Sequence, residues 1–381
     1  MIKKIVGNIQ NFMYNIGSKY FGKEKNKILM IGSYQKFGSI IKELKKNKNN
    51  IVIRGSTTVG RSLFRKDVDY FITFENSEDH IKKILRNINF VVTTNDIIPF
   101  EKNVIKIAHD MKINSLIVQH GYPTNLSIFQ SIPITSTKIA LWGELTKNFL
   151  IKGGAEKEKM VITGSPQFDD YVLRKPDKKE NTLDKYNIPY SKNIILFTAQ
   201  PLRYEVGIGH DRLTLDEHKE IFHNLFEVAK ELNYFLIIKL HPSNEPCYSD
   251  ILDLISAKNY DNYIVLKHEQ ADLFDLIDIC DVSITYNSTT AIESMILKKP
   301  VITVNFSGRN DSINYAQYDC AINVTTKDML KKSILDLIND KLIRDKLMIK
   351  ANRFLKYSFY NLDGLSSQRV ANLIISMINK N

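Results

Sequence analysis

The sequence predicts an α/β protein with two Rossmann-like, doubly wound parallel sheets, one in each of two domains that face a cleft. Three observations support this fold class. The chain has 381 residues, enough for two packed cores with terminal extensions. Short, nearly continuous apolar runs alternate with helical stretches, a pattern typical of parallel strands covered on both faces. The alternation stops at a polar segment, residues 174–192, and then restarts.

The first series of alternating elements predicts a domain over residues 27–173. Its apolar runs have the length of buried strands, and turn residues separate them from the helical stretches. We expect strands at 28–31, 51–53, 69–74, 90–93, 116–118, 139–142 and 160–162.

Residues 174–192 predict a linker, because the segment is charged and is interrupted by Pro176 and Pro189. A second domain follows over residues 193–357. Its predicted strands are 194–197, 235–240, 263–266, 282–285 and 301–304, and its predicted helices are 215–232, 248–257, 271–279, 289–297 and 327–357. The last segment, 358–381, carries a C-terminal helix at about 365–379.

Residues 1–26 predict a basic amphipathic helix. Apolar side chains recur at intervals of three or four from Ile2 to Tyr20, and residues 1–27 carry six lysines against the single acidic residue Glu24. Such a helix could lie on an anionic membrane surface or dock on its own domain, and the sequence leaves both open.

Composition excludes several classes of protein. The net charge of +11, from 53 basic and 42 acidic residues, favours an anionic partner. No apolar run approaches the roughly 20 residues of a membrane-spanning helix, and the N-terminus lacks the pattern of a secretory signal. Cys247, Cys280 and Cys320 are too few and too widely spaced for a disulfide framework or a zinc site. We therefore expect a cytoplasmic protein, with the basic helix as a candidate attachment to the inner face of the membrane.

The strand at 235–240 ends abruptly in His241 followed by Pro242. The proline keeps residue 241 extended, so the imidazole is presented at the tip of the strand. A histidine can donate a hydrogen bond and carry a positive charge near neutral pH, which suits a phosphate. A purely structural histidine is the alternative.

Small polar residues join the strand at 282–285 to the helix that follows. The turn consists of Asn287, Ser288, Thr289 and Thr290. Backbone amides, hydroxyls and the positive end of the helix dipole converge there and predict a phosphate site, with an ordinary N-cap as the alternative. One turn later, Glu293 could accept hydrogen bonds from ribose hydroxyls or lie solvated on the surface.

The strand at 116–118 ends in Gln119, His120 and Gly121, where the glycine permits a sharp turn. One strand-end histidine in each domain would place the two imidazoles across the cleft. We expect His241 to hold a phosphate and His120 to remove a proton from an acceptor hydroxyl.

Other strand ends supply weaker candidates for ligand contact, each of which could be a plain turn. They are Gly32 and Ser33, Thr198 and Gln200, and Gly164-Ser165-Pro166 with Asp169. Asp67 and Asp69 have the spacing of a metal-binding pair but lack further carboxylates or histidines nearby, so we expect no metal site.

Together these motifs resemble those of the GT-B glycosyltransferases of bacterial surface and capsule polysaccharide synthesis. That broad group includes polysialyltransferases, Kdo transferases and the CDP-glycerol glycerophosphotransferases of teichoic acid synthesis. The resemblance rests on Gln119-His120-Gly121, Gly164-Ser165-Pro166 with Asp169, Lys239-Leu240-His241-Pro242, and residues 287–290 with Glu293 and Lys299-Pro300.

The resemblance implies that His241 and residues 287–290 bind the donor phosphate and that Glu293 binds the nucleotide ribose, with Thr198 and Gln200 nearby. His120 matches the base of the glycerophosphotransferases. The acceptor side would include Gln119, Gly121, Gly32 and Ser33.

The implied function is a metal-independent glycosyltransferase. It would move a sugar from a nucleotide-activated donor, CMP- or UDP-linked, to a hydroxyl of a cell-surface glycan, with no further cofactor and no nucleic-acid partner. Three alternatives stay open. They are a CDP-glycerol or CDP-ribitol polyol-phosphate transferase, a non-hydrolysing UDP-sugar epimerase, and a non-catalytic scaffold at the membrane surface.

Overall fold

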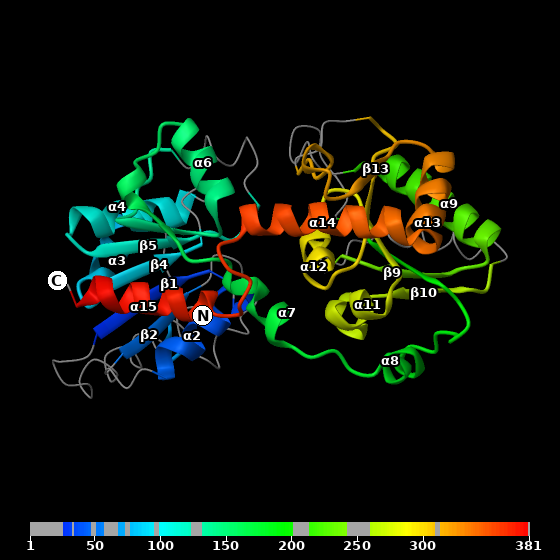
Figure 1. Ribbon diagram of the computed structural model, residues 1–381. Helices are drawn as coiled ribbons and strands as arrows, with labels where there is room; N and C mark the ends of the chain where they lie inside the picture. The colour runs from blue at the N-terminus through cyan, green and yellow to red at the C-terminus, as the bar shows by residue number, and fades with distance from the viewer. Residues whose placement is uncertain are drawn as a thin grey trace.

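The computed structural model describes residues 26–32, 34–46, 51–56, 68–72, 77–94, 99–122, 132–200, 213–241, 260–308 and 313–379. These residues form two α/β lobes, each with a parallel sheet between helices (Figure 1). The predicted amphipathic helix lies outside the described residues apart from Asn26, and so do Ser33, Pro242 and the helix expected at 248–257.

Seven parallel strands form the first sheet in the described part of the chain, in the order β3-β2-β1-β4-β5-β6-β7. Their bounds are β1 Asn26–Ile31, β2 Ile51–Ser56, β3 Tyr70–Phe71, β4 Phe90–Thr93, β5 Asn114–Val118, β6 Lys138–Leu141 and β7 Met160–Ile162. The reversal of strand order beside β1 is that of a doubly wound sheet. Helices α2 Tyr34–Lys46, α3 Glu78–Leu85, α4 Pro99–Asp110 and α6 Glu144–Lys152 cover this sheet. The predicted strands are confirmed, although β3 is shorter than expected.

The second sheet has six parallel strands among the described residues, in the order β10-β9-β8-β11-β12-β13. The strands are β8 Ile194–Thr198, β9 Phe235–Lys239, β10 Tyr263–Leu266, β11 Val282–Thr285, β12 Val301–Val304 and β13 Ile322–Val324. The helices are α9 Leu215–Leu232, α11 Leu273–Ile279, α12 Thr290–Ile296 and α13 Lys327–Asn339. Five of these strands were predicted, and the short edge strand β13 was not.

Alternation along the central strands builds a core on each face of each sheet. In β1, Ile28 and Met30 join the core on one face, whereas Leu29 and Ile31 join the core on the other. Because successive side chains of a strand point to opposite faces, an unbroken apolar run is what a sheet with helices on both sides requires.

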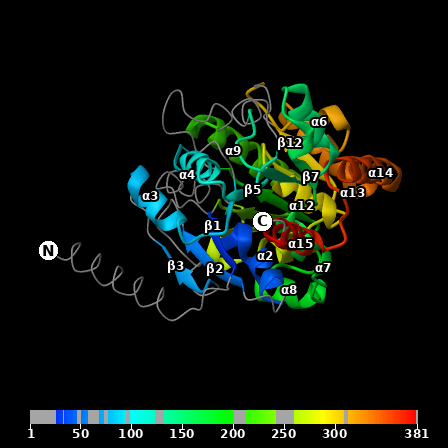
Figure 2. The ribbon, with the colours of Figure 1, turned by 90° about the vertical axis from the view of Figure 1, so that its left-hand side faces the viewer.

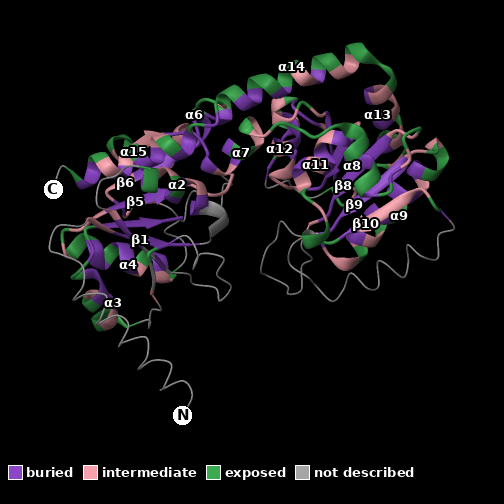
Figure 3. Ribbon diagram, turned by 90° about the horizontal axis from the view of Figure 1, so that it is seen from below, coloured by how far each residue is buried: buried purple, intermediate pink, exposed green. Residues whose placement is uncertain are grey.

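The predicted helical stretch 327–357 is two helices, α13 and α14 Lys341–Ser358. The break falls at Asp340, whose carboxylate accepts the N–H groups of Leu342 and Ile343 and so caps the start of α14. Helix α14 runs from the second lobe towards α6 of the first, and its outer side is largely exposed (Figure 3). None of the helices in the described residues has the length and apolar character needed to cross a bilayer.

The last helix, α15 Ser366–Ile378, returns to the first lobe. It lies beside α2 and contacts β5 (Figures 1 and 2). Val370, Ala371 and Ile374 of α15 belong to the same core as Ile28 and Met30. The end of the chain therefore completes the interior of the first lobe.

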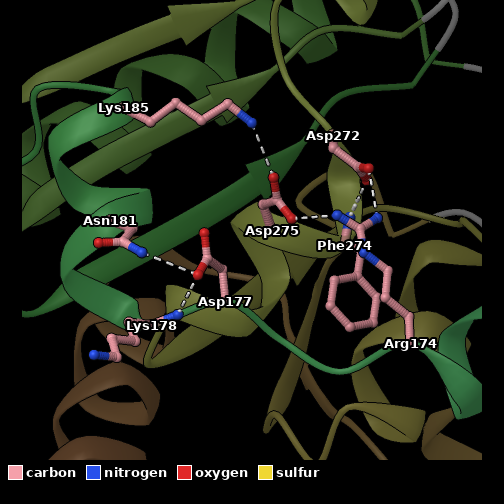
Figure 4. Close-up of polar contacts among 8 residues, drawn as sticks. All are labelled: Arg174, Asp177, Lys178, Asn181, Lys185, Asp272, Phe274 and Asp275. Carbon is pink, nitrogen blue, oxygen red and sulfur yellow. Dashed lines mark hydrogen bonds and ion pairs between the residues drawn. The ribbon is translucent and has the colours of Figure 1, made fainter.

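Residues 163–193 connect the lobes and include η3 Pro166–Phe168, α7 Asp169–Leu173 and α8 Lys179–Lys185. Arg174, just after α7, anchors this linker to the start of α11 (Figure 4). Its guanidinium bonds to Asp272 at 2.5 Å and to Asp275 at 2.6 Å, and lies 4.4 Å from the ring centre of Phe274. Lys185 adds a second contact to Asp275 at 3.1 Å. The linker is thus fixed to the second lobe beyond residue 174.

An aromatic cluster joins the lobes. The Trp142 ring stacks on Phe359 at 5.6 Å, and Phe168 meets both rings edge-on. The same apolar cluster continues into the second lobe through Ala291 and Phe354.

Candidate functional site

The carboxyl edge of the second sheet brings three predicted donor-binding residues into one row. Thr198 of β8 pairs with Lys239 of β9 on one side and with Thr285 of β11 on the other. Two positions beyond these paired residues come Gln200, His241 and Asn287. Since adjacent strands lie about 4.8 Å apart, the strands that carry His241 and Asn287 are separated by roughly 10 Å.

The turn into α12 is held by hydroxyl contacts. Ser288 Oγ accepts the N–H of Thr290, the first residue of α12, at 3.2 Å, whereas the N-cap residue Thr289 makes no side-chain capping bond. Thr290 Oγ1 lies 2.8 Å from Thr198 Oγ1, which ties the turn to β8. Thr198 is 3% exposed, so this residue, predicted to contact the donor, instead supports the turn from within. Ser288, Thr289 and Thr290 remain partly accessible.

A loop beyond β12 braces the same turn. Asn287 Oδ1 accepts the N–H of Ile313 at 2.9 Å, and the Tyr315 hydroxyl donates to Ser288 O at 2.8 Å. The Tyr315 ring lies 6.2 Å from the ring of Tyr122, which belongs to the first lobe and follows His120 and Gly121. The structure thus brings the end of β5 close to the start of α12 across the lobe boundary.

Glu293 is not a solvated surface residue. Its Oε2 is buried and has no hydrogen-bond partner among the described residues. Burial raises the pKa of Glu293 to about 8. Burial, with the nearby Glu293 charge as a lesser cause, also raises the pKa of Tyr315 well above its usual value. Most buried polar atoms in proteins have a partner, so the Glu293 carboxyl is an exception among the described residues.

His120 lines a small pocket at the end of β5. The lining residues are Thr94, Val118, Gln119, His120, Ser165, Pro166 and Gln167. His120 Nδ1 lies 2.9 Å from the carbonyl oxygen of Thr94. A carbonyl can only accept, so Nδ1 carries the hydrogen and Nε2 is the basic nitrogen of the neutral ring. This tautomer is the one that a general base acting through Nε2 needs.

Glu101 supports this arrangement and was not predicted. Its carboxylate, on α4, is 1% exposed and accepts the Thr94 N–H at 3.3 Å, with the Thr94 hydroxyl at 3.5 Å. Thr94 in turn presents its carbonyl to His120. The available sequence signal was an acidic side chain on the apolar face of the helix, beside Val104 and Ile105.

Gln119 positions the turn instead of offering its amide to an acceptor. Its Nε2 donates to Gly121 O at 2.9 Å and to Thr146 Oγ1 at 3.0 Å, and its Oε1 accepts the N–H of Trp142 at 2.9 Å. The side chain therefore has a structural role, and because Gln119 also lines the His120 pocket, its place on the acceptor side stays a prediction. Gly121 has no positive φ, so the turn does not depend on a left-handed glycine.

Gly32 has a packing reason to be glycine. Its φ is +155°, and a Cβ would lie 2.7 Å from the Phe37 ring and 3.0 Å from Thr94 Cγ2. It therefore lets the chain pass close to the residue that orients His120. Its predicted partner on the acceptor side, Ser33, lies outside the described residues.

The segment from Gly164 to Asp169 mainly docks the C-terminal helix. Asp169 accepts the N–H groups of Ser366 at 3.0 Å and Ser367 at 2.6 Å. Gly164 has φ +82°, and a Cβ there would come within 2.5 Å of Ser366 Oγ. Ser165, Pro166 and Gln167, between these two anchors, are the part of the segment that lines the His120 pocket.

Two further residues of the predicted motifs have structural roles. The Lys239 ammonium is buried and donates to Lys267 O at 2.7 Å, and burial lowers its pKa. Asp69 Oδ2 accepts the N–H of Ile53 at 2.8 Å. Within the described ranges, no group of three or more His, Cys, Asp or Glu side chains is arranged to hold a metal ion.

The family comparison identifies the protein class. A family model described as CDP-Glycerol:Poly(glycerophosphate) glycerophosphotransferase matches residues 145–376, well over half of the chain. The chain belongs to this glycerophosphotransferase family. This match confirms the predicted resemblance to the broad group of enzymes of bacterial surface-polymer synthesis. Within that group it supports the glycerophosphotransferases.

This chain is similar to the teichoic acid glycerol-phosphate primase of Bacillus subtilis (strain 168). The two are 25% identical over 258 residues, which make up 67% of this chain and 61% of the primase. The chain thus spans less than two thirds of the length of that relative.

Solved structures confirm the GT-B-like fold class. The UDP-GlcNAc 2-epimerase of Methanocaldococcus jannaschii is 17% identical, with a TM-score of 0.65, and the match covers 92% of this chain and 99% of the epimerase. A variant of the wall teichoic acid polymerase TagF is also 17% identical, with a TM-score of 0.63. This match covers 94% of this chain and 90% of the TagF chain. At this identity the likeness establishes the fold alone.

Proposed function

We propose that this chain transfers a polyol phosphate from a CDP-linked donor, of the CDP-glycerol type, to a hydroxyl of a cell-surface polymer. The observation that carries the proposal is the family match over residues 145–376, which includes the row of donor-side residues and the turn into α12. A CDP-linked polyol therefore replaces the CMP- or UDP-linked sugar expected from the broader resemblance. A teichoic acid primase as relative and a TagF structure soaked with CDPG support the same choice.

In the proposed reaction the acceptor oxygen attacks the phosphorus next to the polyol. The new bond joins this phosphorus to the acceptor oxygen, and the bond to the oxygen bridging the two phosphates breaks. CMP leaves with the bridging oxygen and its electron pair, while His120 Nε2 takes the acceptor proton. The product carries a new phosphodiester between the acceptor oxygen and the polyol.

We assign the donor to the second lobe. His241 and the partly accessible residues 288–290 would hold the diphosphate, and Glu293 would meet the ribose. Fixed hydrogen-bond donors stabilise charge as the phosphate departs, so we propose no metal ion and no further cofactor for this step. His120 precedes the matched region, and its assignment as base rests on the pocket geometry and on its fixed tautomer.

The acceptor would be a membrane-linked polymer on the cytoplasmic side. The basic helix predicted over residues 1–26 is the proposed attachment to anionic lipid. We expect no nucleic-acid partner.

The test uses the full chain with CDP-glycerol, CDP-ribitol or UDP-GlcNAc and an alkyl-linked glycerol-phosphate oligomer as acceptor. We expect CMP release and a new phosphodiester signal in the phosphorus NMR spectrum with a CDP-polyol. Sugar transfer without new phosphodiester would favour the glycosyltransferase alternative. Conversion of UDP-GlcNAc without acceptor would favour the epimerase, and activity in cells that survives loss of both histidines would favour the scaffold.

Variants test the site itself. His120→Ala and His241→Ala should each lower turnover by about 10² to 10³-fold, the loss typical of one catalytic donor or base. His109→Ala and His223→Ala are matched controls, because both residues lie on exposed positions of α4 and α9. Equal turnover in all four variants would show that the site assignment is wrong. In a thermal-shift panel of CMP, CDP, UDP and GDP, cytidine nucleotides should raise Tm most.

A further inference from the structure

Ser165 has a buried hydroxyl that the fold does not use. The residue is 3% exposed, and its Oγ has no hydrogen-bond partner among the described residues. Most buried hydroxyls in proteins are satisfied, so one that is not deserves a specific explanation. Ser165 lines the same pocket as His120, so this pocket is the nearest described space from which a ligand could supply the missing partner.

The backbone around Ser165 is fixed from both sides. Gly164 is packed against Ser366 in a left-handed conformation, and Pro166 occupies the first position of η3. Asp169, three residues further, is bound to the start of α15. Ser165 is therefore held at the pocket wall by the same anchors that dock the C-terminal helix.

The chemistry of the wall selects a class of ligand. Besides the His120 imidazole it offers hydroxyl and amide groups and the apolar surfaces of Val118 and Pro166. No lysine, arginine, aspartate or glutamate is among the described residues that line it. Among these described lining residues a phosphate would find no countercharge apart from the imidazole, whereas a neutral hydroxyl-bearing group would find both donors and acceptors.

We propose that this pocket is the acceptor-polyol subsite and that Ser165 Oγ binds an acceptor hydroxyl adjacent to the one that His120 deprotonates. This inference rests on the proposed function. Ser165 takes no part in bond making or breaking. It selects an acceptor end with neighbouring hydroxyl groups.

Ser165→Ala is the direct test, with CDP-glycerol as donor and the alkyl-linked glycerol-phosphate oligomer as acceptor. We expect the KM for the acceptor to rise about five- to tenfold, the loss of one neutral hydrogen bond. The KM for the donor should not change. The rate at which CDP-glycerol is hydrolysed to CMP without acceptor should not change either. Tm should stay equal or rise, because the substitution removes an unsatisfied buried hydroxyl.

Ser367→Ala is the matched control. Ser367 is 4% exposed and its Oγ likewise has no partner among the described residues, but it does not line the pocket. The Tm of Ser367→Ala should be close to that of Ser165→Ala. Its KM for the acceptor should equal that of the unchanged protein. An oligomer lacking the hydroxyl next to the reacting one should show the same KM rise with the unchanged protein and no additional rise with Ser165→Ala.

The outcomes separate the two proposals. If Ser165→Ala leaves the acceptor KM unchanged while His120→Ala stops transfer, the subsite proposal is wrong and the proposed function stands. A joint loss of Tm, donor binding and turnover in Ser165→Ala would show a structural role and overturn the subsite. Failure of the unchanged protein to transfer polyol phosphate to any hydroxyl acceptor would overturn both.

Discussion

The Asp169 carboxylate accepts the backbone N–H of Ser366 at 3.0 Å across 197 positions of sequence. With its second bond to Ser367, this side chain joins the linker between the lobes to the first turn of α15. A motif that resembles a ligand-binding turn in the sequence is thus largely an internal brace, although Ser165 and Pro166 within it line the His120 pocket.

Asp169→Ala should lower the free energy of unfolding by about 1–3 kcal/mol. The change leaves two N–H groups at the start of α15 without an acceptor in a buried setting. Urea unfolding followed by circular dichroism measures the loss. Asp170→Ala is the control, since Asp170 is exposed beside it, and equal midpoints for the two variants would contradict the bracing role.

Arg174→Ala should destabilise the linker contact by about 1 kcal/mol, because one guanidinium bridges Asp272 and Asp275 and covers Phe274 at a partly exposed site. The difference from the unchanged protein should shrink in high salt. Arg174→Lys should not restore it, since an ammonium lacks the planar fork that reaches both carboxylates.

Lys185→Ala serves as the comparison for Arg174. Lys185 is more exposed and makes an ion pair with Asp275 but none with Asp272, so its removal should cost less. Limited proteolysis between residues 174 and 192 reports the same contact. Cleavage that is no faster in Arg174→Ala than in Lys185→Ala would argue against an anchored linker.

Glu293→Gln should change how stability depends on pH. The folded-state pKa of about 8 lies above the ordinary value of 4.5, so between these values the folded protein binds a proton that the unfolded chain has released. Stability therefore falls as pH rises from about 4.5 to about 8, by at most about 1.4 kcal/mol per pH unit from this group. In unfolding experiments from pH 5 to 9, the free energy of unfolding of the glutamine variant should therefore decrease less with rising pH than that of the unchanged protein. Parallel curves for the two proteins would contradict it.

Glu101→Ala should lower kcat for transfer about tenfold while leaving the donor KM unchanged. The carboxylate holds Thr94, whose carbonyl fixes the His120 tautomer, so its loss would affect the base and not the nucleotide. Glu101→Gln keeps one acceptor oxygen and should recover part of the rate. Lys102→Ala, at the exposed neighbouring position, should behave like the unchanged protein. A uniform loss in kcat and donor binding would point to general misfolding.

Most of the fold is predictable from the sequence because parallel strands buried on both faces must be apolar throughout. Runs such as 194–197 and 235–238 are long enough to stand out between helices. The edge strand β13 has three residues and contains Asn323, so it carries too little apolar signal. The break between α13 and α14 depends on Asp340 acting as a cap within a stretch whose spacing is helical on both sides.

The candidate site is predictable in outline but not in detail. Strand ends locate His120, His241 and residues 287–290, because side chains at carboxyl edges share one side of a sheet. The sequence cannot distinguish a group that touches ligand from one that holds its neighbour, as Gln119 and Thr198 show. Burial of Glu293 depends on contacts between distant segments, which local pattern does not report.

The position of α15 has a consequence for biosynthesis. The first lobe lacks part of its interior until residues 366–378 have emerged from the ribosome, although its strands are made first. The second lobe contains all of its own sheet within residues 194–324 and can mature earlier. A premature stop codon shortly before residue 366 would thus destabilise the first lobe, which is encoded at the opposite end of the gene.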